Sequence, residues 1–197
     1  MLSLRTHESL APDAVVPLLL GRFGRPYRYA LRCPSTQRLL GPDDPQGAVA
    51  VAEEQTEGRG RLGRRWLAPP GSSVLCSVLL RPTVAPARLP ELTPLAAEAC
   101  AEAIANVTPL APAIKRPNDV LIDGRKVAGI LGEAHGADVV LGIGINANAE
   151  ATELPREARL PATSLLVEAG ERVGRTALLV ALLECLERRY DAWVGGR

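Results

Sequence analysis

The sequence is poor in the residues that form disulfides, bind metals or act as bases beside a nucleophile. It holds 4 cysteines and 2 histidines in 197 residues. The cysteines lie far apart with no C-x-x-C pair, so neither a zinc ribbon nor a disulfide framework is indicated. Neither His7 nor His135 accompanies a serine or cysteine nucleophile motif, which argues against a histidine-dependent hydrolase. We expect a reduced, cytoplasmic protein with no metal ligands of its own.

A strong net charge and long apolar runs are also absent. The 23 basic and 22 acidic residues leave a formal charge of +1, so no global field steers the protein to nucleic acid or an acidic membrane. The apolar stretch at residues 10–20 is broken by prolines and an aspartate, which makes it a poor membrane span or signal sequence. With 47% hydrophobic residues, a chain of this length predicts a single domain over residues 1–197.

Lysine is rare among the basic residues. Lys115 and Lys126 are the two lysines, and the other basic residues are arginine. Coding bias is a sufficient explanation of this skew. Where arginine is the usual cation, however, a lysine raises the question of what its compact, strongly hydrated charge does that a planar guanidinium cannot.

Hydrophobic periodicity predicts several strands and few helices. Strands are expected at residues 27–31, 48–52, 73–80, 120–122, 127–131 and 139–145, and helices within 86–107 and over 179–193. Ser35-Thr36 is typical of a cap for a short helix through Leu40. Asp123-Gly124 suits a type I′ hairpin turn. This order predicts an α+β fold with a mixed sheet and not a regular βαβ arrangement.

The glycine- and arginine-rich loop at residues 55–66 follows one of these strands. Gly58 to Gly63 satisfies the G-x-G-x-x-G pattern of dinucleotide-binding proteins, but Pro69-Pro70 comes too soon for a helix to open and face a pyrophosphate. The loop offers a flexible backbone and guanidinium groups that can grip carboxylate or phosphate oxygens. A solvated basic loop, or an RNA-contacting arginine-glycine segment, explains the composition equally well.

Two further polar segments adjoin predicted strands. Lys115 to Asp119 precedes the hairpin, and a lysine at a strand end could reach a carboxylate oxygen and an α-phosphate together. Asn118 and Asp119 could fix the loop or help to place a metal, although Pro-Asn-Asp is also an ordinary polar turn. In Gly142 to Asn148, small residues and an amide end a strand where a flat ring could approach, although Asn146 could simply satisfy a turn.

In this order, the segments closely resemble the catalytic domain of biotin protein ligases. The resemblance covers Tyr27 to Trp193 and rests on Ser35-Thr36, Glu53 to Trp66, Lys115 to Leu131, and Gly142 to Asn146. It implies a mixed, largely antiparallel sheet with helices packed on it, as in lipoyl-attaching enzymes and class II aminoacyl-tRNA synthetases. It also implies ATP-dependent biotinylation of a lysine on a biotin carboxyl carrier protein. The reaction would pass through biotinyl-5′-adenylate, releasing pyrophosphate and then AMP, with biotin and ATP as substrates and Mg²⁺ as the metal.

The same resemblance implies roles for individual residues. Lys115 and Arg61 would be catalytic, with Lys115 bridging the biotin carboxylate and the α-phosphate. Biotin would be bound by Ser35, Thr36, Gln37, Gln55, Gly58, Arg59, Gly60, Arg61, Lys115 and Gly129. ATP and the adenylate would be bound by Arg59, Arg61, Arg64, Trp66, Lys115, Asn118 and Asn146. Gln37 and Arg116 depart from the asparagine and tryptophan that are usual in the family.

The resemblance also bears on partners and domains. Relatives commonly continue into a small C-terminal β-barrel, and some carry an N-terminal winged helix that represses transcription. We expect neither in this chain. The carrier protein would then be the partner, with no nucleic acid and no membrane, and a homodimer is compatible with the sequence. A lipoate or octanoate ligase of the same fold is the alternative enzyme, and it would share a core lysine but not the arginine-glycine loop.

Overall fold

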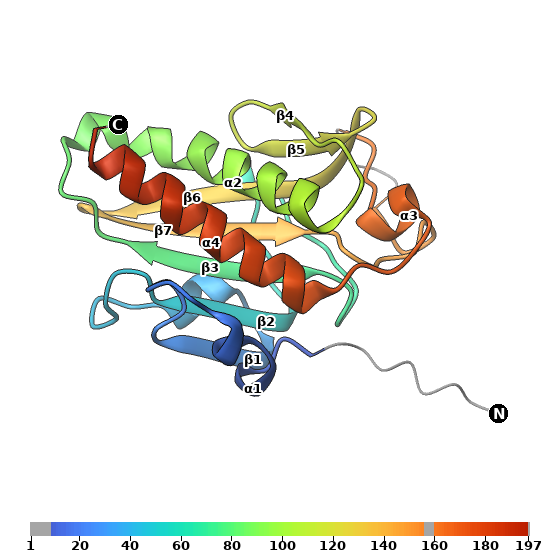
Figure 1. Ribbon diagram of the computed structural model, residues 1–197, viewed down its shortest axis with the longest axis horizontal. Helices are drawn as coiled ribbons and strands as arrows, with labels where there is room; N and C mark the ends of the chain where they lie inside the picture. The colour runs from blue at the N-terminus through green and yellow to red at the C-terminus, as the bar shows by residue number, and fades with distance from the viewer. Residues whose placement is uncertain (1–8, 156–159, 197) are drawn as a thin grey trace.

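The computed structural model describes residues 9–155 and 160–196, and its named strands form one sheet (Figure 1). Their order is β1-β2-β3-β7-β6-β5-β4. β1 and β2 run parallel, and every other neighbouring pair runs antiparallel. The predicted α+β fold with a mixed, largely antiparallel sheet is therefore confirmed. The strands are β1 (Tyr27–Cys33), β2 (Val49–Gln55), β3 (Val74–Leu80), β4 (Ala113–Lys115), β5 (Asp119–Ile122), β6 (Arg125–His135) and β7 (Asp138–Ile145).

Two long helices, α2 (Leu92–Val107) and α4 (Arg175–Val194), lie side by side across one face of this sheet (Figure 1). α2 contributes small buried residues, so its backbone can approach the strands closely, and α4 contributes larger ones. These are Ala96, Ala99 and Ala103 of α2 and Leu179, Leu182, Leu183, Leu186 and Tyr190 of α4. Both helices match the predicted apolar spacing. No helix in the described ranges is long and apolar enough to cross a membrane.

Alternation along β7 separates the two faces of the sheet. Leu141, Ile143 and Ile145 belong to the core under the helices. Successive side chains of a strand point to opposite faces, so Gly142 and Gly144 face away from the helices. The glycines therefore leave a hollow on the uncovered face.

The hairpin between β5 and β6 has the turn that its sequence predicts. Asp123 and Gly124 have positive φ angles of 47° and 76°, as a type I′ turn requires at both central positions. The register then shifts beside the turn, because Val120 pairs with Ala128 whereas the next residue, Leu121, pairs with Lys126. Val127 is thus an extra residue on β6, and such a bulge re-aims the side chains beside it.

Several short elements escaped prediction. They are α1 (Pro12–Val15), the 3₁₀ helix at Val16–Leu18, the strand β4 and α3 (Leu165–Ala169). α3 carried readable signals, because the Ser164 hydroxyl accepts a hydrogen bond from the Val167 N–H and Gly170 ends the helix with φ 76°. The predicted helix after Ser35 is a 3₁₀ helix at Thr36–Leu39, and the Ser35 side chain makes no capping hydrogen bond.

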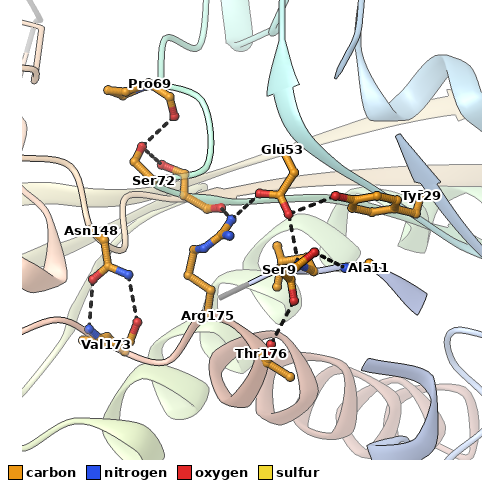
Figure 2. Close-up of polar contacts among 12 residues, drawn as sticks. Ser9, Ala11, Tyr29, Glu53, Pro69, Ser72, Asn148, Val173, Arg175 and Thr176 are labelled. Carbon is orange, nitrogen blue, oxygen red and sulfur yellow. Dashed lines mark hydrogen bonds and ion pairs between the residues drawn. The ribbon is translucent and has the colours of Figure 1, made fainter. Parts of the chain in front are cut away.

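A buried ion pair fastens the start of α4 to β2 (Figure 2). Arg175 is 2% exposed, and its Nη1 lies 2.6 Å from Oε2 of Glu53. Nη1 also donates to the carbonyl oxygen of Ser73, while the other oxygen of Glu53 accepts from the Leu10 N–H and the Tyr29 hydroxyl. Buried charges need this degree of pairing. The network anchors the end of β2, two residues before Gln55.

Candidate active site

A cavity of about 380 Å³ lies on the sheet face opposite α2 and α4. Strands β6 and β7 form its floor. Three segments that are distant in the sequence form its walls: residues 35–37, the arginine-glycine loop at residues 59–67, and residues 160–162. Small-molecule sites typically enclose roughly 300–1,000 Å³, so the cavity suits a ligand of that class.

The floor is flat because three of its residues have no side chain. A Cβ atom on Gly144 would lie 2.6 Å from Cε2 of Trp66, and one on Gly129 would lie 2.9 Å from Cζ3 of the same ring. At Gly142 the nearest atom is Cδ of Gln37, at 3.1 Å. The indole therefore rests directly on the backbone of two strands, which only glycine permits. The sequence predicted this access for a flat ring at the end of β7.

One end of the cavity is lined by buried, uncharged polar groups. The Thr36 N–H and hydroxyl both approach Oε1 of Gln55, at 2.7 Å and 3.2 Å. Beside them, Nε2 of Gln37 donates to the carbonyl oxygens of Leu131 and Val140. These contacts hold the side chains of residues 35–37 against the sheet. Such an end suits a neutral ring that carries hydrogen-bonding groups.

The arginine-glycine loop forms another part of the cavity wall. Arg61 donates to Oδ1 of Asn118, Arg64 to the Arg61 carbonyl, and Arg65 to the Thr56 carbonyl. Each of these partners is a neutral oxygen, so the three charges are not balanced by a carboxylate in the described ranges. Arg59 differs, because its guanidinium pairs with Glu133 of β6 through both terminal nitrogens, at 2.8 Å and 2.9 Å. The loop is thus held across the cavity and retains positive charge for an anion.

No α-helix opens after Gly63. A single 3₁₀ turn at Arg61–Gly63 is followed by extended chain. The structure therefore agrees with the rejection of a dinucleotide-binding fingerprint, which needs a helix N-terminus at this place.

Lys126 also lines the cavity, paired with an acidic residue. Its Nζ is 2.5 Å from Oδ1 of Asp119 and 5.5 Å from the centre of the Trp66 ring. Asp119 pairs with Gly129 across the strands, which places it on the cavity side, and the bulge at Val127 brings Lys126 to that side as well. Nε1 of Trp66 is buried and has no hydrogen-bond partner in the described part of the chain. A buried donor of this kind is available to a ligand.

Lys115 requires a correction. It was predicted as the central lysine, but its side chain is exposed and does not line the cavity. The physical reason is its position on β4, the edge strand, where it pairs with Asp119 and lies one strand farther from the cavity. Arg116 also points away, towards Glu98 of α2 at 3.4 Å, so this departure from the family pattern leaves the cavity wall unaltered.

The predicted contact of Gly58 with biotin also requires a correction. It lies outside the cavity, beside a hollow of about 420 Å³ on the outer side of the loop. A Cβ atom there would lie 2.4 Å from the carbonyl oxygen of Trp66, whose N–H donates to the Gly58 carbonyl. Gly58 therefore allows the loop to fold back on itself and does not contact a ligand in the cavity.

The structure brings the other predicted residues together around the cavity. These are Ser35, Thr36, Gln37, Gln55, Arg59, Gly60, Arg61, Arg64, Trp66, Asn118, Gly129 and Asn146. Their predicted contacts with biotin or ATP stay predictions. Nδ2 of Asn146 also donates to the Thr163 carbonyl, so Asn146 holds in place the chain that follows the wall residues 160–162. Sequence reasoning named Asp119 only as a residue that could fix the loop or help to place a metal, and it assigned no ligand contact to Lys126 or Arg65, although the rarity of lysine pointed to Lys126 as strongly as to Lys115.

Comparison with known proteins identifies the group to which this architecture belongs. The model of the biotin/lipoate A/B protein ligase family matches residues 30–149, which include the neutral polar residues at 35–37, the arginine-glycine loop and the hairpin. The chain belongs to this family. Membership agrees with the resemblance of the motifs and with the fold.

The similar proteins that follow are ligases by name. The bifunctional ligase/repressor BirA of Bacillus subtilis is 39% identical over 165 residues, covering 79% of this chain and 51% of the relative. The biotin–[acetyl-CoA-carboxylase] ligase of Mycobacterium tuberculosis is 39% identical over 154 residues, covering 76% and 56%. The chain thus spans about half the length of these curated relatives. A solved biotin protein ligase from Aquifex aeolicus, in complex with biotin and ATP, matches with a TM-score of 0.77 and 32% identity, covering 85% of this chain and 71% of that one.

Proposed function

We propose that this chain carries the catalytic site of a biotin protein ligase. It would join biotin to ATP as biotinyl-5′-adenylate and transfer the biotinyl group to a lysine of a biotin carboxyl carrier protein. The observation that carries the proposal is the lining of one cavity, which brings together neutral polar groups, a cationic loop and Lys126. Biotin has a neutral ring and a carboxylate tail, and ATP adds phosphates beside that carboxylate.

The first step needs two anions to approach each other. A biotin carboxylate oxygen attacks the α-phosphorus, the new P–O bond forms as the bond to the β-phosphate oxygen breaks, and pyrophosphate leaves. Lys126 would contact both the carboxylate and the α-phosphate, since its compact ammonium lines the same cavity as the neutral polar groups and the arginine loop. Arg61 and Arg64 would hold the phosphates, because their present partners are neutral oxygens.

The second step uses the activated carboxyl group. The neutral ε-amine of the carrier lysine attacks the acyl carbon, an amide bond forms, and the bond to AMP breaks. The amine loses a proton as AMP leaves. In this proposal the arginine-glycine loop would cover the mixed anhydride and keep water from it until the carrier arrives.

The site fits Mg²⁺ that arrives with the nucleotide. Among the described residues, no group of three or more His, Cys, Asp or Glu side chains is placed to hold a metal. Mg²⁺ in nucleotide sites usually takes one or two carboxylates, with phosphate and water oxygens as its other ligands. Within the described ranges, Asp119 is the one acidic residue that lines the cavity, and it would be a contact of the chain with MgATP.

The wider setting belongs to the same proposal. The four cysteines are free thiols and buried, which supports a reducing, cytoplasmic compartment. The carrier protein as partner, the absence of nucleic-acid binding and a homodimer stay predictions. The single domain over residues 1–197 also stays a prediction.

Isotope exchange of labelled pyrophosphate into ATP tests the first step. Exchange that depends on biotin and Mg²⁺ is expected, and lipoate in place of biotin should give none because its dithiolane ring cannot use the polar end of the cavity. Exchange with lipoate alone would assign the chain to the other branch of the family. Transfer is then tested with a purified carrier domain and its lysine-to-arginine variant as control, where labelling of the variant would contradict the proposed acceptor.

A further inference from the structure

A fully buried hydroxyl lies directly behind the neutral polar end of the cavity. Ser77 is in the middle of β3, whose other residues are apolar, and it is 0% exposed. Its Oγ lies 2.7 Å from Oγ1 of Thr36. Burial of a hydroxyl costs free energy unless it is hydrogen-bonded, so this contact is the reason that a serine is tolerated here. Ser77 does not itself line the cavity.

The direction of the hydrogen bonds follows from one unambiguous donor. The backbone N–H of Thr36 can only donate, so the Gln55 atom 2.7 Å from it must be the oxygen Oε1. The Thr36 hydroxyl is 3.2 Å from the same oxygen, and a carbonyl oxygen has no proton to give. The Thr36 hydroxyl is therefore the donor, and its single proton is committed to Gln55.

That commitment fixes the role of Ser77. With the Thr36 proton used, the contact at 2.7 Å requires Ser77 to donate to Thr36. The chain of donors runs from Ser77 through Thr36 to Gln55, and successive bonds in such a chain polarise one another. The Gln55 amide is thereby held with its oxygen inward. Within the described ranges, Nε2 of Gln55 makes no hydrogen bond, which leaves this group as a donor at the cavity.

We infer that Ser77 is a positioning residue for ring recognition. Through Thr36, it orients the Gln55 amide so that this end of the cavity presents a donor, Nε2 of Gln55, beside an acceptor, the remaining lone pair of Thr36 Oγ1. A ring with a carbonyl acceptor next to an N–H donor matches this pair. The inference rests on the proposed function and deepens it, because it makes the cyclic urea of biotin the recognised feature and places part of the selectivity outside the cavity wall.

The neighbours of Ser77 make the test practicable. Its partners across the strands are Ala50 and Gly142, which are small, so Ser77→Thr keeps the hydroxyl and has room for one methyl group. Ser77→Ala removes the donor and one oxygen atom. A matched control is Ser72→Ala, since Ser72 is also buried just before the same strand but donates to the Pro69 carbonyl.

Calorimetric binding of biotin and of ATP to the whole chain is the experiment. Ser77→Ala should weaken biotin about tenfold, as expected for one hydrogen-bond network, and leave the ATP affinity within twofold. Ser77→Thr should restore biotin binding, and Ser72→Ala should leave both affinities unchanged. 2-Iminobiotin, which replaces the urea carbonyl with C=NH, should bind wild type weakly and lose less than biotin on Ser77→Ala. In a Thr36→Val background, Ser77→Ala should add little, because the chain is already interrupted.

The outcomes separate the two ideas. If wild type binds biotin and Ser77→Ala binds it equally well, the positioning role is overturned and the proposed function stands. A parallel loss of biotin and ATP affinity would also overturn it, because a merely structural residue affects both. If wild type binds no biotin, the proposed function fails and the inference fails with it. Should Ser77→Ala not fold, Ser77→Cys supplies a thiol that donates only weakly, and unchanged biotin affinity in that variant refutes the inference.

Discussion

Removing the ammonium of Lys126 should abolish most of the adenylation and little of the stability. In Lys126→Ala, the ammonium that lines the cavity is lost while the arginine loop remains. Removal of one preorganised electrostatic group from a reacting centre typically lowers kcat by about 10²- to 10³-fold. We therefore expect biotin-dependent pyrophosphate exchange to fall by about that factor.

The effect on folding should be small. Lys126 and Asp119 form an ion pair with side chains 25% and 16% exposed, and partly exposed pairs of this kind contribute up to about 1 kcal/mol. The midpoint of urea denaturation should shift only slightly. Lys126→Arg should keep the pairing with Asp119 but recover little exchange, since a planar guanidinium cannot replace a compact charge.

Lys115→Ala provides the matched control. It removes the other lysine of the chain, from the exposed edge strand β4, and exchange should remain near the wild-type rate. The measurement is the initial rate of exchange at saturating biotin and MgATP, with circular dichroism as the check on folding. Full activity of Lys126→Ala, or equal losses in both variants, would refute the assignment of the central lysine.

Three other features give measurable expectations. Glu133→Gln should speed hydrogen exchange in residues 59–65 of the ligand-free protein, since it removes the carboxylate that holds Arg59. The control Glu57→Gln, which loosens the exposed ion pair with Arg38, should not change this exchange. Equal exchange rates in the two variants would contradict the prediction. Arg175→Met should lower the free energy of unfolding by about 3–5 kcal/mol in urea titrations, because it leaves Glu53 without its buried partner, and a loss below about 1 kcal/mol would contradict the structural role. Burial raises the pKa of the Cys76 thiol to about 12 from an ordinary value of 9.0. The contribution of this thiol to stability is therefore complete below pH 9 and is lost as the pH rises from 9 towards 12. Cys76→Ala should flatten this decline, measured by thermal unfolding across that pH range.

Local sequence signals gave the fold more reliably than the site. The β5–β6 hairpin is predictable because its turn residues, Asp123 and Gly124, and its apolar strands lie within a few positions of each other. The long helices are predictable because their apolar spacing repeats over several turns. The strand β4 has three residues and depends on its pairing with β5, which no local pattern reveals.

The choice between the two lysines could not be made from the sequence. Strict alternation along β6 places Lys126 on the same side as Ala128 and Ile130, which belong to the core. Only the bulge at Val127, visible in the register with β5, turns Lys126 to the cavity. Lys115 was predicted because it lies at the end of a strand, as expected for a lysine that contacts a ligand. Its strand is at the edge of the sheet, however, and this position keeps Lys115 away from the cavity.

Ser77 shows a second limit of sequence reasoning. A serine within an apolar strand is an ordinary observation, and its partner Thr36 is 41 positions away. The importance of its hydroxyl follows only when three side chains from separate elements are considered together.

The row of glycines on the uncovered face of the sheet limits the substitutions that these positions can accept. Along β7, positions 141, 143 and 145 face the helices and should accept other apolar residues of similar size. Positions 142 and 144 should accept almost nothing larger than glycine, since even one methyl group meets Gln37 or Trp66. A saturation scan of this strand under selection for activity should therefore show tolerance that alternates with a period of two. In such a scan, the positions that tolerate only glycine would mark the floor of the cavity, where a side chain is absent.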